Sequence, residues 1–191
     1  MKRGLLLDDE PFVLKALQRV LTPSGTPGRL PPLQLDLFAD PVEALAKARH
    51  VAYDFVIADY RMPGMSGVEF LRQLRAIQPD TVRIILSGQA DLDGVIGAVN
   101  VGGIHRFIAK PWDNDALIAA LAEELANRET RLENGRLADV VRVERGSLTA
   151  EELERRRLEA LEPGITQVNW GPDGAVLLDE SLLDATESRN K

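Results

Sequence analysis

The sequence predicts an α/β protein with a doubly wound parallel sheet, followed by a small extension. Short apolar runs alternate with helical patterns through the first two-thirds of its 191 residues, which is typical of repeated βα units. The strand runs are apolar almost throughout, as expected for strands covered on both faces. Polar residues with useful chemistry fall where these runs end, and open parallel sheets bind ligands at that edge.

The first half supplies three strands and two helices. Pro11 suits the first position of a helix, and Asp40 before Pro41 is a good N-cap. The stretch 22–32 is rich in Pro and Gly and is expected to be a loop. The expected elements are a strand at Leu5–Leu7, a helix at Phe12–Leu21, a strand at Leu33–Phe38, a helix at Pro41–Arg49 and a strand at Tyr53–Ala58.

The second half repeats this order. Ser66 and Glu69 form a capping-box pattern, and Pro79 ends the helix that follows it. Asp113 is the expected N-cap of the last helix of the sheet domain. The expected elements are a helix up to Ile77, a strand at Val82–Leu86, a helix at Asp91–Val101, a strand at His105–Ala109 and a helix through Leu117, Leu121 and Leu125.

The pattern changes near residue 126, so we expect one domain at 1–126 and a helical linker with a β-hairpin at 127–191. Thr149 and Glu152 form a capping box for a helix ending at Leu161. The turn signal at 171–174 favours a hairpin between the apolar runs on either side. The segment 131–146 stays open, because Asn134-Gly135 could end a helix while the apolar residues around it could continue one.

Composition excludes several classes of protein. The net charge of −7 and pI near 5.0 argue against a chain whose main task is to bind nucleic acid, so no DNA contact is expected. The absence of cysteine removes disulfides, thiol catalysis and Cys-based zinc sites. The apolar run after Met1 is too short for a signal segment or a membrane span. We therefore expect a soluble, cytoplasmic protein that does not contact a membrane.

Five polar side chains end four of the strands, at Asp8, Asp9, Asp59, Ser87 and Lys110. With the expected strand order 2-1-3-4-5, these strands are neighbours, so the side chains converge on one pocket. Crowded carboxylates repel unless a cation joins them, and oxygen ligands completed by water describe Mg²⁺. The lysine would supply a positive charge for a phosphoryl oxygen, and the hydroxyl another hydrogen bond.

Each residue also has an ordinary interpretation. The acids after Leu7 could simply enrich a helix N-terminus, and Asp59 could form a turn before Pro63-Gly64. Ser87 and Lys110 could be a loop residue and a surface lysine. Their joint placement at four adjacent strand ends favours a site, because the ordinary interpretations would have to coincide.

Four segments resemble the signature blocks of the receiver domain of two-component response regulators, a flavodoxin-like fold. They are Leu5–Glu10, Ala58–Gly67, Leu86–Gly88 and Phe107–Trp112, in order and suitably spaced over residues 1–126.

This resemblance implies a role for each site residue. Asp59 would accept a phosphoryl group, with Mg²⁺ held by Asp8, Asp9, Asp59 and the backbone carbonyl of Arg61. Ser87 would be the switch hydroxyl, Lys110 the phosphoryl partner and Phe107 the switch aromatic. The Lys110-Pro111 bond would be cis.

The implied function is signalling rather than enzymatic. A sensor histidine kinase would phosphorylate Asp59, and the switch would change contacts with a protein partner or a second copy as a homodimer. In that dimer the face of Leu117, Leu121 and Leu125 could join the hairpin in the interface. The alternative is the regulatory part of a larger enzyme, such as a cyclic-dinucleotide phosphodiesterase. We interpret the two histidines, His50 and His105, as surface or strand-edge residues.

Overall fold

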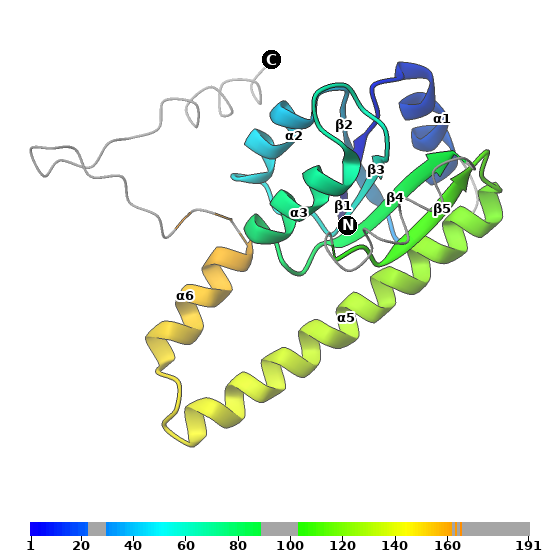
Figure 1. Cartoon of the computed structure of the whole chain (residues 1–191). Coiled ribbons are helices and arrows are strands. Elements are labelled where there is room, and N and C mark those ends of the chain that lie inside the picture. The colour runs from blue at the N-terminus through cyan, green and yellow to red at the C-terminus, as the bar shows by residue number, and fades with distance from the viewer. Residues whose placement is uncertain (23–29, 89–102, 162, 164, 166–191) are drawn as a thin grey trace, which may run out of the picture.

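A computed structural model describes residues 1–22, 30–88, 103–161, 163 and 165. Its centre is a five-stranded parallel sheet of order β2-β1-β3-β4-β5 (Figure 1). The strands are β1 at Lys2–Leu7, β2 at Leu33–Phe38, β3 at Phe55–Asp59, β4 at Val82–Gly88 and β5 at Arg106–Lys110. The helices are α1 at Pro11–Leu21, α2 at Pro41–Ala48, α3 at Gly67–Ile77, α5 at Asn114–Glu144 and α6 at Ala150–Leu161. The predicted fold class and strand order are confirmed.

The sheet separates two hydrophobic cores, because successive side chains of a strand point to opposite faces. Leu5 and Leu7 belong to the core under α2 and α3, whereas Leu6 belongs to the core under α1 and α5. Figure 1 shows these helix pairs on opposite faces of the sheet. Burial on both faces explains why the strand runs are apolar without alternation.

Helices α1, α2 and α5 begin at the residues that the sequence predicts. Pro11 is the first residue of α1, and the Asp40 carboxylate accepts a hydrogen bond from the Val42 N–H at 2.6 Å. Asp113 caps α5 in the same way, through the Ala116 N–H. Thr149 and Glu152 bond each other's backbone N–H groups, which completes a capping box.

The box predicted at α3 is only half formed. The Ser66 hydroxyl accepts from the Glu69 N–H at 3.2 Å, but the Glu69 carboxylate accepts from Arg72 and Gln73 instead of returning to Ser66. The guanidinium one turn along the helix is a stronger donor than the backbone N–H, because it carries a positive charge.

Helix α5 is one continuous helix of 31 residues, which settles the segment left open around Asn134-Gly135. It passes the expected boundary at residue 126 without a break, and the boundary itself stays a prediction. A turn at 145–149 leads into α6, and Arg156 of α6 forms an ion pair with Asp139 of α5. Figure 1 shows this helical pair extending beyond the sheet.

One expectation about α5 is wrong. Leu117, Leu121 and Leu125 are 0%, 0% and 4% exposed and belong to the core of their own domain. They are therefore not available for an interface with a second copy. The predicted helix at 91–101 and the hairpin after Ile165 lie outside the described residues. Among the helices that are described, none is long and apolar enough to cross a membrane.

Candidate functional site

The carboxyl ends of β1, β3, β4 and β5 bring the predicted polar residues to one edge of the sheet. Parallel register places Asp59 opposite Leu86 and Gly88 opposite Lys110. Asp8 follows β1 directly and is fully buried. The strand order therefore brings Asp8, Asp59 and Lys110 together, although 102 residues separate the first from the last.

Lys110 lies between the two buried carboxylates. Its ammonium Nζ is 2.8 Å from Asp8 Oδ2 and 2.5 Å from Asp59 Oδ1. Two carboxylates this deeply buried need a shared cation, since each would otherwise lose its hydration without compensation. The lysine side chain is only partly buried.

Backbone N–H groups hold the remaining carboxylate oxygens. Glu10 N–H donates to Asp8 Oδ1 at 2.9 Å, and Arg61 N–H donates to Asp59 Oδ2 at 2.7 Å. Burial raises the pKa of Asp8, and the hydrogen bonds from Lys110 and Glu10 oppose that rise only in part. The pKa of Lys110 is raised because the hydrogen bonds from its ammonium to Asp59 and Asp8 outweigh its own desolvation.

The backbone comes unusually close at Asp59. Gly67 at the start of α3 lies against this residue, and a Cβ built there would be 2.0 Å from the Asp59 carbonyl oxygen. The Gly67 N–H also donates to the Tyr60 carbonyl at 3.0 Å. A glycine is thus required here, and it fixes the loop after β3 against the first turn of α3.

The other predicted site residues lie around this centre. Ser87 is 1% exposed, and its hydroxyl donates to the Gly88 carbonyl at 3.1 Å rather than to a pocket carboxylate. Asp9 is exposed. Phe107 is partly buried against the core under α2 and α3. The Lys110-Pro111 bond is cis, as predicted.

The donor chemistry of the pocket fits a hard cation. Asp8 and Asp59 present carboxylate oxygens, the ligand type that Mg²⁺ prefers. Among the residues that the structure describes, however, no three acidic or imidazole groups are already gathered at metal-binding distance. Asp9 stands outside, and the lysine ammonium lies between the other two carboxylates. Of the proposed ligands, Asp8 and Asp59 both contact Lys110, and the roles of Asp9 and the Arg61 carbonyl stay predictions.

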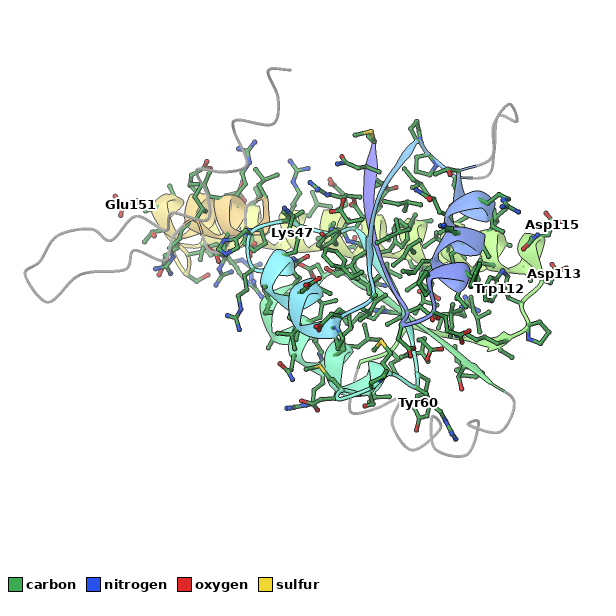
Figure 2. The ribbon with its side chains drawn as sticks, turned by 90° about the horizontal axis from the view of Figure 1, so that it is seen from above. Lys47, Tyr60, Trp112, Asp113, Asp115 and Glu151 are labelled. Carbon is green, nitrogen blue, oxygen red and sulfur yellow. The ribbon has the colours of Figure 1, made fainter. Side chains whose placement is uncertain are left out.

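Aromatic residues mark two sides of this edge. Tyr60 follows β3, and Trp112 follows β5 next to Asp113 at the start of α5 (Figure 2). Trp112 packs against the core under α1 and α5. Phe12, in the first turn of α1, is 84% exposed beside the acidic residues.

The fold and this pocket define a doubly wound α/β domain with buried carboxylates and a lysine at the carboxyl edge of its sheet. The family model of the response regulator receiver domain matches residues 5–122. This chain belongs to that family, a family of signalling proteins found in two-component systems.

Several relatives are transcriptional regulators. The chain is similar to the hydrogenase transcriptional regulatory protein HoxA of Bradyrhizobium diazoefficiens, with 30% identity over 153 residues, covering 74% of this chain and 30% of that protein. It is also similar to the C4-dicarboxylate transport transcriptional regulatory protein DctD of Rhizobium meliloti, with 33% identity over 129 residues, covering 68% and 26%. The chain thus spans about a third or less of these curated relatives.

The fold also resembles solved receiver domains. The signal receiver domain of an HD domain-containing protein from Pseudomonas fluorescens Pf-5 has a TM-score of 0.61 and 32% identity, covering 68% of this chain and 98% of that one.

The DNA-binding transcriptional regulator NtrC of Escherichia coli is 26% identical over 149 residues, covering 74% of this chain and 30% of NtrC. The expectation that this chain does not contact DNA therefore stays a prediction.

Proposed function

We propose that Asp59 accepts a phosphoryl group from a sensor histidine kinase and that this modification switches contacts with a protein partner. The contact of Lys110 with both Asp59 and Asp8 carries this proposal. This contact holds a nucleophilic carboxylate beside a lysine ammonium, at the edge of the sheet where ligands bind.

The chain's own groups divide the work. Asp59 Oδ2 is oriented by the Arg61 N–H, which leaves Oδ1, now bonded to Lys110, as the oxygen to attack phosphorus. As this O–P bond forms, the P–N bond to the kinase's phosphohistidine breaks and the imidazole leaves. As the phosphoryl group arrives, the Lys110 ammonium exchanges Asp59 Oδ1 for a phosphoryl oxygen and neutralises part of its charge. Asp8, Asp9, Asp59 and the Arg61 carbonyl would hold Mg²⁺, which when bound supplies further charge neutralisation.

The switch would act through Ser87 and Phe107. Among the described residues the Ser87 hydroxyl bonds its neighbour's carbonyl, so it can turn to a phosphoryl oxygen for the loss of this neutral hydrogen bond. Its movement would make room for Phe107, which is only partly buried and has further to turn inward. The surface formed by β5 and α5 would then change its contacts.

The output remains a protein contact in this proposal, and homodimerisation is one form of it. The curated relatives reported above are named as transcriptional regulators, so the phosphodiesterase alternative is not favoured.

Intact-mass measurement tests the acceptor directly. Acetyl phosphate with Mg²⁺ should add one phosphoryl group to the wild-type chain and none to Asp59→Asn. Asp40→Asn is the matched control, because asparagine caps α2 as well as aspartate does and should leave labelling unchanged. Equal labelling of Asp59→Asn would refute the assignment.

Lys110→Ala tests the division of roles. This variant should still bind Mg²⁺, since the proposed ligands are carboxylate and carbonyl oxygens, but it should fail to change Trp112 fluorescence on addition of beryllofluoride. Loss of Mg²⁺ binding with an intact fold would contradict the proposed division.

A further inference from the structure

The amino-terminal edge of the sheet carries a basic cluster that the proposed phosphoryl transfer does not use. Arg83 at the start of β4 is 4% exposed, and its guanidinium donates to the backbone carbonyls of Gly103, Pro79 and Thr81. The Arg75 side chain of α3 crosses Gly103, where a built Cβ would be 3.0 Å from its Cδ and Nη1. We call Arg75, Arg83, His105 and Arg131 the amino-edge cluster.

Hydrogen bonding fixes the tautomer of His105. Its Nδ1 accepts a hydrogen bond from the Arg83 backbone N–H at 3.1 Å, so Nδ1 carries a lone pair. Burial and the neighbouring Arg83, Arg131 and Arg75 lower the pKa of His105 to about 4, so the ring is neutral at pH 7. The one ring proton is therefore on Nε2.

With this tautomer, a hydrogen-bond donor of Arg131 lies next to a hydrogen-bond donor of His105. Nη2 of Arg131 lies 3.5 Å from His105 Nε2, and with this tautomer both atoms carry N–H groups. Neither has an acceptor there among the residues that the structure describes. An acceptor atom to one side of this pair, within hydrogen-bond distance of both nitrogens, would satisfy both groups.

The electrostatic field around this point is positive. Within the described parts of the chain, the ion pairs of arginine are formed by other arginines, and Arg75, Arg83 and Arg131 form none. The charge of Asp80 acts on Arg83 without forming an ion pair with it, and the Asp54 carboxylate at the same edge is paired with Lys2 and Arg128. The chain thus concentrates positive charge here despite its net charge of −7.

The geometry points to a binding site for a small oxyanion of the phosphate class, with Arg131, Arg75 and the Nε2–H of His105 as its donors. A tetrahedral oxyanion offers acceptors in several directions, as donors from α3, α5 and the start of β5 require, whereas a carboxylate offers them in one plane. Two accessible guanidinium groups also match the charge of a dianion.

Nuclear magnetic resonance of the imidazole nitrogens in the full chain tests this site locally. Inorganic phosphate is added at pH 7 and constant ionic strength. The chain has two histidines, so His50 is an internal control. The Nε2 resonance of His105 should shift saturably while that of His50 stays fixed. The spectrum of the free chain should already show the Nε2–H tautomer.

Two variants and a matched control identify the donors. Arg131→Gln and Arg75→Gln should each weaken phosphate binding about tenfold, the loss expected for one charge-assisted hydrogen bond. Arg157→Gln, which removes an exposed arginine of α6 paired with Glu154, should leave the affinity unchanged. Phosphate bound in the Asp59 pocket at the opposite edge would not depend on Arg131 or Arg75.

Three results would overturn the proposal. One is the absence of saturable binding. Another is an equal loss of affinity in Arg157→Gln, which would indicate general screening of charge. The third is a shift of His105 by a short DNA duplex but not by inorganic phosphate, which would make the cluster a nucleic-acid contact instead of a small-oxyanion site.

Discussion

The two edges of the sheet solve the burial of charge in opposite ways. At the carboxyl edge, the Lys110 ammonium is surrounded by the carboxylates of Asp8 and Asp59. At the amino edge, the Arg83 guanidinium is surrounded by backbone carbonyls and by other cations. One edge holds its buried cation between anions, whereas the other satisfies the hydrogen bonds of its buried cation and leaves that cation without an ion pair among the described residues.

This difference indicates how the buried cation of each edge is held: Lys110 by ion pairs, and Arg83 by hydrogen bonds to backbone carbonyls. A pocket made of opposite charges can reorganise when a new anion or cation enters, because each partner has a replacement. A guanidinium bonded to three carbonyls has no such replacement, and those carbonyls come from two separate loops. We therefore expect the amino edge to be the structural one and the carboxyl edge to be the adaptable one.

The largest effect should come from Arg83→Met. The substitution keeps an apolar stem but leaves the carbonyls of Gly103, Pro79 and Thr81 without their donor, so unfolding free energy should fall by about 3–5 kcal/mol. Arg72→Met, which removes an exposed ion pair on α3, should cost about 0.5 kcal/mol or less. Urea denaturation of Arg83→Met and Arg72→Met measures both losses. Equal midpoints would contradict the structural role assigned to the amino edge.

Glycine substitutions should rank the rigidity of the two edges. Gly67→Ala forces a Cβ onto the Asp59 carbonyl and should cost about 3 kcal/mol, because neither backbone segment can withdraw. Gly103→Ala meets the flexible end of Arg75 and adopts a φ of +58°, so about 1 kcal/mol is expected. Thermal unfolding of both variants would contradict this reasoning if Gly103→Ala were the more damaging.

His105 should make stability depend on pH at the amino edge. Its pKa falls from 6.5 to about 4 on folding, so the unfolded chain binds more protons between these values. The contribution is fully present above pH 6.5 and is lost as the pH falls through about 4. The charges of Arg83, Arg131 and Arg75 act on the ring, and that of Asp80 acts on Arg83.

The measurement is a difference between two chains. Wild type should lose about 2 kcal/mol more than His105→Asn between pH 6.5 and 4, after allowance for partial solvent screening. Asparagine retains an acceptor for the Arg83 N–H but does not titrate. Parallel pH profiles for the two chains would exclude the assignment of a buried neutral imidazole.

The smallest effect is expected away from both edges. Gly135 lies inside α5 with nothing within 4 Å of a built Cβ, so Gly135→Ala should stabilise the helix by about 0.5–1 kcal/mol. Hydrogen exchange of α5 amides would detect the gain. A destabilised variant would indicate that this turn of α5 makes a contact that the described residues do not include.

Some features could be predicted from the sequence because they depend on local patterns. Asp40 and Asp113 were recognisable as caps, and the apolar strands identified the sheet and its order, which in turn placed Asp8, Asp59 and Lys110 together. The roles assigned to these residues in phosphoryl transfer remain predictions.

Other features depend on contacts between distant segments. The continuity of α5 past Asn134-Gly135 was not predictable, because one glycine costs about 1 kcal/mol and the helix formers on either side decide the outcome. No local pattern marks His105 either, since its partner is a backbone N–H 22 residues away. For the same reason, the sequence alone could not show that Leu117, Leu121 and Leu125 are buried in the core of their own domain.

The length of α5 has a mechanical consequence. Arg128 bonds Asp54 and the Asp80 carbonyl, Lys2 pairs with Glu129, and Arg131 approaches His105. Among the described residues, the last attachments of the helix to the domain therefore lie at the amino edge. Beyond Arg131 about 13 residues, or roughly 20 Å of helix, extend as a lever with its fulcrum at these contacts. A tilt of roughly 10° there would displace the far end by about 3.5 Å, so a small change of angle at the domain becomes a displacement the size of a side-chain contact.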